Sequence, residues 1–215
     1  MDGASAIPNY GETDAEQRTR SPGRIGPNAL LQVFNVLDDV FGAEETKRLT
    51  RRAGLGHHVA SPPSSMVDER DVVALHRTIR ASLSADQASH VLWQAGTRTA
   101  NYILANRIPK RAQIVLRALP ARPASALLLR AIAKNAWTFA GSGQFSFRGG
   151  RPALITLADC PACFDVYQAD EPCLYYTATF EGLFRALVHP GAQIADQGST
   201  SPDGRQRIFR LNWPS

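Results

Sequence analysis

The sequence predicts an α+β fold in which N-terminal helices pack on a C-terminal four-stranded antiparallel sheet. Apolar residues recur at helical spacing as far as about Phe139. After Gly141 and Gly143 the period changes from 3.6 to two, which indicates strands. One more helical segment, 173–188, separates two pairs of alternating segments. The sheet-containing part therefore has the order strand, strand, helix, strand, strand.

The chain has 215 residues, which suits one domain with a tail. Residues 1–24 are polar and rich in Gly, Ser and Pro, and we expect them to form a disordered tail. Residues 25–215 are expected to form a single domain, with a helical part at 25–140 and a sheet-containing part at 141–213. Because 44% of the residues are apolar, the domain can bury a core, which excludes a wholly disordered or coiled-coil protein.

Prolines, glycines and cap residues divide the helical part into segments. Pro27 suits the first turn of a helix, Ser84 suits an N-cap, and Pro109 cannot continue a helix. The segments between such positions have apolar residues at helical spacing. The expected helices span residues 27–41, 43–53, 68–83, 85–107, 110–119 and 123–139.

The helix expected over 85–107 is apolar around more than half of its circumference, which is typical of a buried central helix. Its small residues Gly96 and Ala100 would let a close neighbour approach. That neighbour could be the backbone of another helix or a flat ligand.

The strands are bounded by turn residues. Segments 144–148 and 153–158 alternate and flank the hairpin-type pair Gly149-Gly150. A second pair of strands, 192–197 and 205–213, flanks a turn that contains Pro202, Asp203 and Gly204.

Positive charge is concentrated in the middle of the chain. The net charge is +5, yet the 72 residues from Gln87 to Ala158 contain ten Lys and Arg and no Asp or Glu. A segregated field of this kind attracts an anionic partner such as a carboxylate-bearing ligand, a phosphate, a nucleic acid or an anionic lipid. Alternatively, acidic segments from the rest of the chain fold back and neutralise it.

The motifs of several protein classes are missing. The sequence has no P-loop, no His-Glu-x-x-His and no Gly-x-Ser-x-Gly, and the glycines at 141 and 143 follow a helix instead of a strand. We therefore expect no nucleotide or flavin cofactor. The absence of helix-turn-helix and zinc-finger patterns argues against a nucleic-acid partner. With no secretory signal and no membrane-spanning apolar stretch, we expect a cytoplasmic protein or one peripheral to a membrane.

The three cysteines have a spacing that suits a metal. Cys160 and Cys163 are separated by two residues, so both thiolates can reach one ion, and Cys173 follows. Zinc or iron could bind there, with Asp159, Asp165 or His189 as a fourth ligand. The alternative is a set of small buried cysteines at a strand end. A reducing compartment argues against a disulfide.

Other titratable side chains lie on predicted helices. His76 and His90 could point inward, where a neutral imidazole can be an axial ligand to magnesium or iron, although a satisfied structural histidine is the alternative. His57 and His58 fall in a turn, and we assign them no role. Glu181 lies in an otherwise apolar helix and could be a buried general acid or a ligand anchor, if it is not on an exposed face.

Four runs of residues carry a resemblance to a known family: 24–30, 100–109, 136–143 and Asp159-Cys160-Pro161-Ala162-Cys163. Over residues 24–213 the chain resembles the 4-vinyl reductase, or BchJ, family of photosynthetic bacteria. The resemblance implies a four-vinyl-reductase ligand-binding domain, related in fold to Bet3-type transport proteins and haem nitric-oxide sensors.

The resemblance implies one of two functions. The first is an accessory or carrier protein that binds a magnesium porphyrin or chlorophyllide in bacteriochlorophyll biosynthesis, with magnesium chelatase subunits or a second copy of the chain as partners. The second is a divinyl chlorophyllide 8-vinyl reductase that takes electrons from an external donor. A regulatory sensor or a zinc-stabilised interaction module is a further alternative.

Aromatic and basic residues coincide near the boundary between the helical and sheet parts, and rings can stack on a planar macrocycle while cations meet its carboxylates. We therefore predict a pocket for a tetrapyrrole between the central helix and the sheet. The residues expected to form its walls are Trp93, Tyr102, Trp137 and Phe180, and those expected to pair with its carboxylates are Arg98, Arg107 and Lys134.

Overall fold

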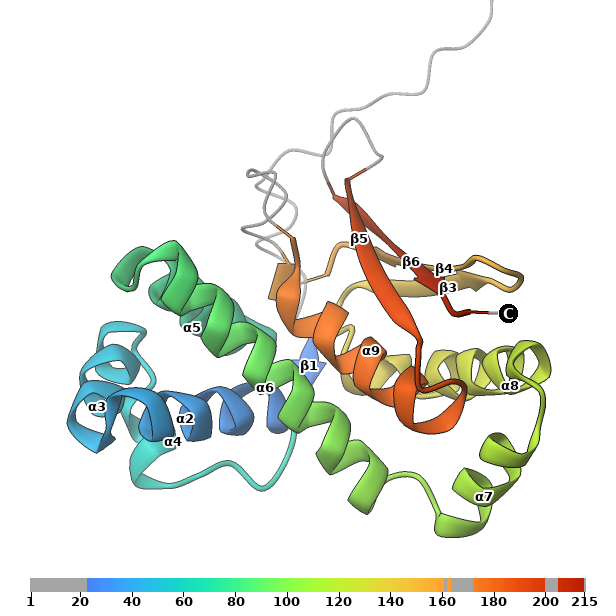
Figure 1. Ribbon diagram of the computed structural model, residues 1–215. Helices are drawn as coiled ribbons and strands as arrows, with labels where there is room; N and C mark the ends of the chain where they lie inside the picture. Colours follow the sequence, from blue (N-terminus) through green and yellow to red (C-terminus); the bar gives the residue numbers. More distant parts are fainter. Residues whose placement is uncertain (1–22, 161, 164–171, 200–204, 215) are drawn as a thin grey trace, which may run out of the picture.

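The computed structural model describes residues 23–160, 162–163, 172–199 and 205–214. Of the tail predicted for residues 1–24, residues 1–22 lie outside these ranges. Figure 1 shows the helical part at the left and lower right, and the sheet at the upper right. The elements are β1 (Arg24–Ile25), α2 (Asn28–Phe41), α3 (Ala43–Arg52), α4 (Gly56–Ala60), β2 (Val67–Asp68), α5 (Glu69–Ser82), α6 (Ala85–Asn106), α7 (Lys110–Ala118), α8 (Ala121–Lys134), η1 (Ala136–Thr138), β3 (Gln144–Arg148), β4 (Ala153–Ala158), α9 (Leu174–Leu187), β5 (Gln193–Ser199) and β6 (Gln206–Asn212).

The predicted α+β class and the strand, strand, helix, strand, strand order are confirmed. The four C-terminal strands form one antiparallel sheet in the order β3-β4-β6-β5. Along β4, Ala153, Ile155 and Leu157 are fully buried and alternate with partly exposed residues. Helices α8 and α9 pack against this sheet, so the core lies between them and its buried face.

Local signals account for the helix starts. The Ser84 side chain accepts a hydrogen bond from Gln87 N, and the Gln87 side chain accepts one from Ser84 N, which completes a capping box at the start of α6. At the start of α5, Asp68 accepts a hydrogen bond from Arg70 N.

Helix α6 packs against α9 through small residues. A Cβ atom on Gly96 would lie 2.2 Å from the Tyr175 carbonyl oxygen, and one on Gly182 would lie 2.7 Å from the Ala100 Cβ atom. The Thr179 hydroxyl also donates to Gly96 O at 3.1 Å. Either a helix or a flat ligand was expected beside Gly96 and Ala100, and in the structure the neighbour is helix α9.

Three features were not predicted. One is the short helix α4, which contains His57 and His58, where a turn was expected. A short ribbon of β1 and β2 holds the first described residues, and Glu69 N donates to Gly23 O at 3.0 Å. The helix expected to reach residue 139 ends at Lys134 and is followed by the 3-10 turn η1. The last carbonyl of this turn, Thr138 O, accepts a hydrogen bond from Gly26 N at 2.7 Å and so links the turn to the ribbon.

Candidate ligand pocket

A cavity of about 260 Å³ lies between α5, α6 and the residues that lead into α9. Its polar lining comes from Arg80 on α5 and Ser89 on α6. The remaining lining is mostly apolar and consists of Ala85, Ala88, Leu92, Pro172 and Leu174. A cation beside an apolar wall suits a ligand that has both an anionic group and an apolar body.

His76 lies one helical turn before Arg80 and is 1% exposed. Its ring contacts the Tyr175 ring edge-on, with centroids 5.5 Å apart. Burial, then the charge of Arg80, lower the pKa of His76 to about 3, and the Ala162 backbone opposes this shift. Neither ring nitrogen makes a hydrogen bond of normal geometry within the described residues. His76 is therefore a neutral, buried imidazole, whereas His90, for which an inward orientation was one alternative, is exposed.

Tyr175 is held in place by a second buried contact. Its hydroxyl lies 2.9 Å from the Thr99 hydroxyl of α6, which also donates to Ala95 O at 2.9 Å. Burial raises the pKa of Tyr175 to about 12, so the phenol is neutral at physiological pH. The ring that faces His76 is thus fixed by α6 as well as by α9.

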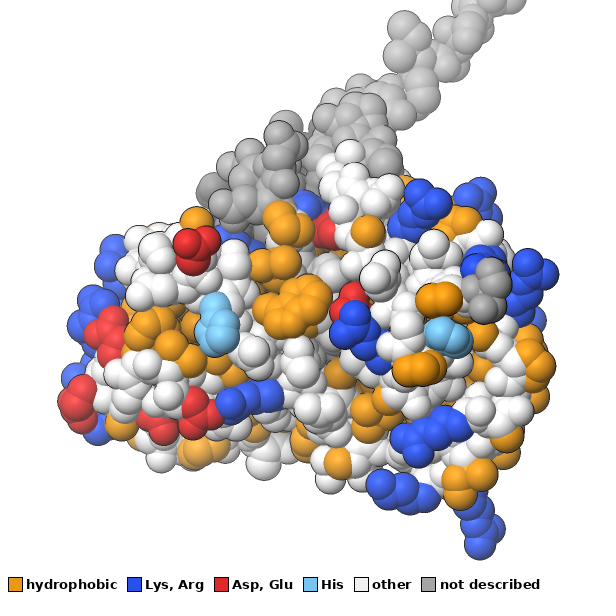
Figure 2. Space-filling model, viewed as in Figure 1, with side chains coloured by type: hydrophobic (Ala, Val, Ile, Leu, Met, Phe, Trp, Pro, Cys, Tyr) orange, Lys and Arg blue, Asp and Glu red, His pale blue; other side chains and the backbone are white. Residues whose placement is uncertain are grey.

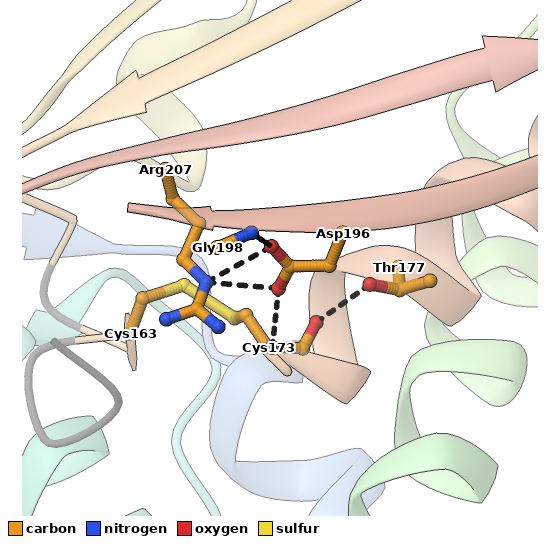
Figure 3. Close-up of polar contacts among 6 residues, drawn as sticks. All are labelled: Cys163, Cys173, Thr177, Asp196, Gly198 and Arg207. Atoms are coloured by element: carbon orange, nitrogen blue, oxygen red, sulfur yellow. Dashed lines mark hydrogen bonds and ion pairs between the residues drawn. A yellow bond between two sulfur atoms is a disulfide. The ribbon is translucent and has the colours of Figure 1, made fainter. Parts of the chain in front are cut away.

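Two of the three cysteines form a disulfide. Cys163 and Cys173 are bonded, with Cα atoms 5.8 Å apart (Figure 3), and Cys160 is a buried thiol outside the disulfide. The expectation that no disulfide would form is therefore wrong, because the chain after β4 returns to the start of α9 at a separation that a disulfide spans. Burial raises the pKa of Cys160 to about 12. The metal site stays a prediction.

The residues proposed as a fourth ligand have other partners where they are described. Asp159 pairs with Arg205 at 2.7 Å, and His189 Nδ1 accepts a hydrogen bond from Gly191 N at 3.0 Å. Asp165 lies outside the described residues.

The predicted aromatic walls do not meet in one cavity, because α9 lies between α6 and the sheet. Phe180, on α9, is 2% exposed and stacks on Tyr176 in an aromatic core. Trp93 and Tyr102 are half-buried on α6, and Trp137 is 64% exposed on η1.

The predicted carboxylate-binding cations are also separated. Arg98 pairs with Asp39 of α2 at 2.6 Å, so here an acidic helix does fold back on the basic segment. The Arg107 guanidinium lies over the Tyr102 ring, 5.8 Å from its centroid. Lys134 is exposed at the end of α8. None of the three lines the cavity beside Arg80.

Glu181 is buried and links α9 to the sheet. One carboxylate oxygen accepts a hydrogen bond from Ile194 N at 3.0 Å, and the other pairs with Arg185 at 2.9 Å. Both oxygens therefore have partners, in the way expected for a structural carboxylate.

One cluster of side chains that could hold a metal ion was not predicted from the sequence. His57 and His58 on α4 and Asp71 on α5 bring ligand atoms within 4.8 Å of one another. His58 Nε2 and Asp71 Oδ2 are 2.9 Å apart, so the pair also ties the two helices together. The His-His pair was the only signal in the sequence, because Asp71 is distant along the chain.

Comparison with solved structures defines the class of the fold. The Fe(II) unliganded H-NOX protein from K. algicida, in a variant form, has a TM-score of 0.59 at 11% identity, covering 89% of this chain and 97% of that one. A structure determined to probe heme distortion in the H-NOX family also has a TM-score of 0.59, at 8% identity, covering 89% and 96%. The chain therefore has an H-NOX-like α+β fold.

Sequence comparison defines the family. The chain is 40% identical over 190 residues to the bacteriochlorophyll synthase 23 kDa chain of Rhodobacter capsulatus, covering 88% of this chain and 87% of the relative. It is 41% identical over 173 residues to the protein of that name from Cereibacter sphaeroides, covering 80% and 82%. No protein-family model matches. The chain belongs to the family of the bacteriochlorophyll synthase 23 kDa chain, which confirms the BchJ resemblance.

Proposed function

We propose that the protein acts in bacteriochlorophyll biosynthesis as an accessory or carrier protein that binds a magnesium porphyrin or a chlorophyllide. The names of its relatives support the pathway. The H-NOX-like fold, which includes structures determined to probe heme distortion, is compatible with a tetrapyrrole ligand. The observation that carries the proposal is the cavity itself, where Arg80 lines the wall and the neutral His76 lies one helical turn away.

Each of these groups matches one part of the ligand. The Arg80 guanidinium suits a tetrapyrrole carboxylate, and Leu92 and Leu174 suit the apolar edge of the macrocycle. His76 does not line the cavity, but it lies one helical turn from Arg80, and a neutral imidazole can bind a central metal ion if the surrounding elements separate. A cavity of about 260 Å³ is smaller than the pockets that enclose drug-sized ligands, so it would take one edge of the macrocycle unless the surrounding elements separate.

Titration of magnesium protoporphyrin into the purified protein, followed by absorbance and fluorescence, tests the proposal. We expect saturable binding at micromolar ligand, and Arg80→Gln should weaken it at least about tenfold, as expected for loss of a charge-assisted hydrogen bond. The dimethyl ester of the same porphyrin, which lacks the carboxylates, should bind both forms equally. Arg98→Gln is the control, because Arg98 lies outside the cavity. Absence of a saturable shift would contradict the proposal.

The alternative function is the 8-vinyl reductase. Reduction of a vinyl group needs two electrons and two protons, and an external donor would have to supply them. Anaerobic incubation of a divinyl chlorophyllide with NADPH or reduced ferredoxin separates the two functions. Multiple turnovers would establish the reductase, and product limited to one equivalent would count against catalysis. Magnesium chelatase subunits and a second copy of the chain are the partners we propose to test next.

A further inference from the structure

Helices α7 and α8 expose large aliphatic side chains. On α7, Ile114 is 64% exposed and Val115 is 53% exposed, and on α8 Leu127 is 44% exposed. Two successive helices therefore present large aliphatic side chains to solvent. Such surfaces mark sites of contact with another molecule or with a membrane.

The orientation of α7 is fixed by contacts on its opposite side. Gln113 is buried, and its amide donates to Leu104 O at 2.6 Å and to Ile108 O at 2.8 Å. Arg117 donates to Ala186 O of α9 at 3.0 Å. These bonds hold the inner face of α7 against α6 and α9, so Ile114 and Val115 are directed away from the core.

Basic residues surround the exposed aliphatic ones. Residues 110–134 contain six Lys and Arg and no Asp or Glu. Within the residues that the structure describes, Lys110, Arg111 and Arg130 form no ion pair, in contrast to Arg98. In Figure 2 blue and orange side chains alternate over α7 at the lower right, whereas red side chains gather over α2 and α3 at the lower left. The basic field is therefore not neutralised here.

We propose that this face, formed by Lys110, Arg111, Ile114, Val115, Leu127 and Arg130 and called the α7–α8 surface, lies on an anionic lipid bilayer. The aliphatic side chains would enter the boundary between headgroups and acyl chains, and the cations would meet lipid phosphates. A nucleic acid would match the charges but not the aliphatic residues between them. Contact would be peripheral, since no helix among the described residues is long and apolar enough to cross a bilayer.

The surface is separate from the cavity between α5 and α6, so the inference does not depend on tetrapyrrole binding. Flotation of the ligand-free protein with vesicles tests it. At about 0.1 M salt we expect binding to vesicles of equimolar phosphatidylglycerol and phosphatidylcholine, little binding to phosphatidylcholine alone, and release at high salt. The double variant Lys110→Gln/Arg111→Gln should bind about 25-fold more weakly, at about fivefold per cation. Ile114→Ser/Val115→Ser should also weaken binding at least about tenfold.

Two matched variants serve as controls. Arg51→Gln/Arg52→Gln removes two exposed cations from α3, and Val40→Ser removes an aliphatic side chain of α2 that is 44% exposed. Both should bind vesicles as the native protein does, and circular dichroism should show that every variant is folded. The proposal is overturned if the native protein does not float with anionic vesicles, if neutral vesicles bind it equally, or if the controls lose as much affinity as the α7 variants. Tetrapyrrole titration of the same samples reports separately on the pocket.

Discussion

Arg207 on β6 and Asp196 on β5 form an ion pair in which each side chain is only 2% exposed, with Nε 2.8 Å from Oδ2. The same oxygen accepts a hydrogen bond from Cys173 N at 2.6 Å, and the other accepts one from Gly198 N at 2.8 Å (Figure 3). One carboxylate therefore joins both strands to the first residue before α9. It also fixes the half-cystine Cys173, so the disulfide and the buried ion pair form one structural unit.

Removal of the carboxylate should be costly. Asp196→Ala would remove this carboxylate from the buried Arg207 guanidinium, and we expect it to lower the free energy of unfolding by about 3–5 kcal/mol. Asp159→Asn is the control, because Asn tolerates the φ of 52° at this position and the pair with Arg205, with side chains 38% and 41% exposed, should contribute at most about 1 kcal/mol. Urea denaturation of both variants measures the difference. Similar losses would show that the burial of the Asp196 pair is unimportant.

The close approach of α6 and α9 leads to a second prediction. In Gly96→Ala the new methyl group would lie 2.2 Å from Tyr175 O, so the helices would have to separate, and we expect a destabilisation of at least about 1–3 kcal/mol. Gly149→Ala meets no atom within 4 Å and should be nearly neutral. Thermal unfolding followed by circular dichroism compares the two. A stable Gly96→Ala variant would mean that the packing between α6 and α9 is looser than described.

These contacts show which parts of the structure could not be predicted from the sequence. The turn and cap residues were sufficient for the order of strands and helix along the chain and for the start of α6 after Ser84, because these depend on neighbouring residues. Gly96 was recognised as a place of close approach, but its neighbour Tyr175 is distant along the chain. The cavity was missed for the same reason, since Arg80 and Leu174 meet only after folding.

His76 should make stability depend on pH. Its pKa is about 3 in the folded protein and about 6.5 when unfolded, so between these values the unfolded chain binds a proton that the folded chain does not. Stability is therefore complete above about pH 6.5 and falls as the pH is lowered, by about 2 kcal/mol from pH 7.5 to 5. Urea denaturation of native protein and His76→Leu at both pH values isolates this contribution, because the variant should lack it. His90→Ala, which removes an exposed histidine, should behave as the native protein, and an unchanged slope in His76→Leu would contradict the assignment.

The state of the cysteines can be decided by counting thiols. Cys163 and Cys173 are bonded, and Cys160 is buried with a pKa raised to about 12, so the folded protein should react negligibly with a thiol reagent. The denatured protein should show one thiol before reduction and three thiols after it. Cys163→Ser should abolish the disulfide and lower the free energy of unfolding by about 2–3 kcal/mol. Elemental analysis of the same samples tests the metal site that the spacing predicts. A count of three thiols without reduction, together with one equivalent of zinc or iron that is lost in Cys163→Ser, would show that the cysteines hold a metal ion instead of forming a disulfide.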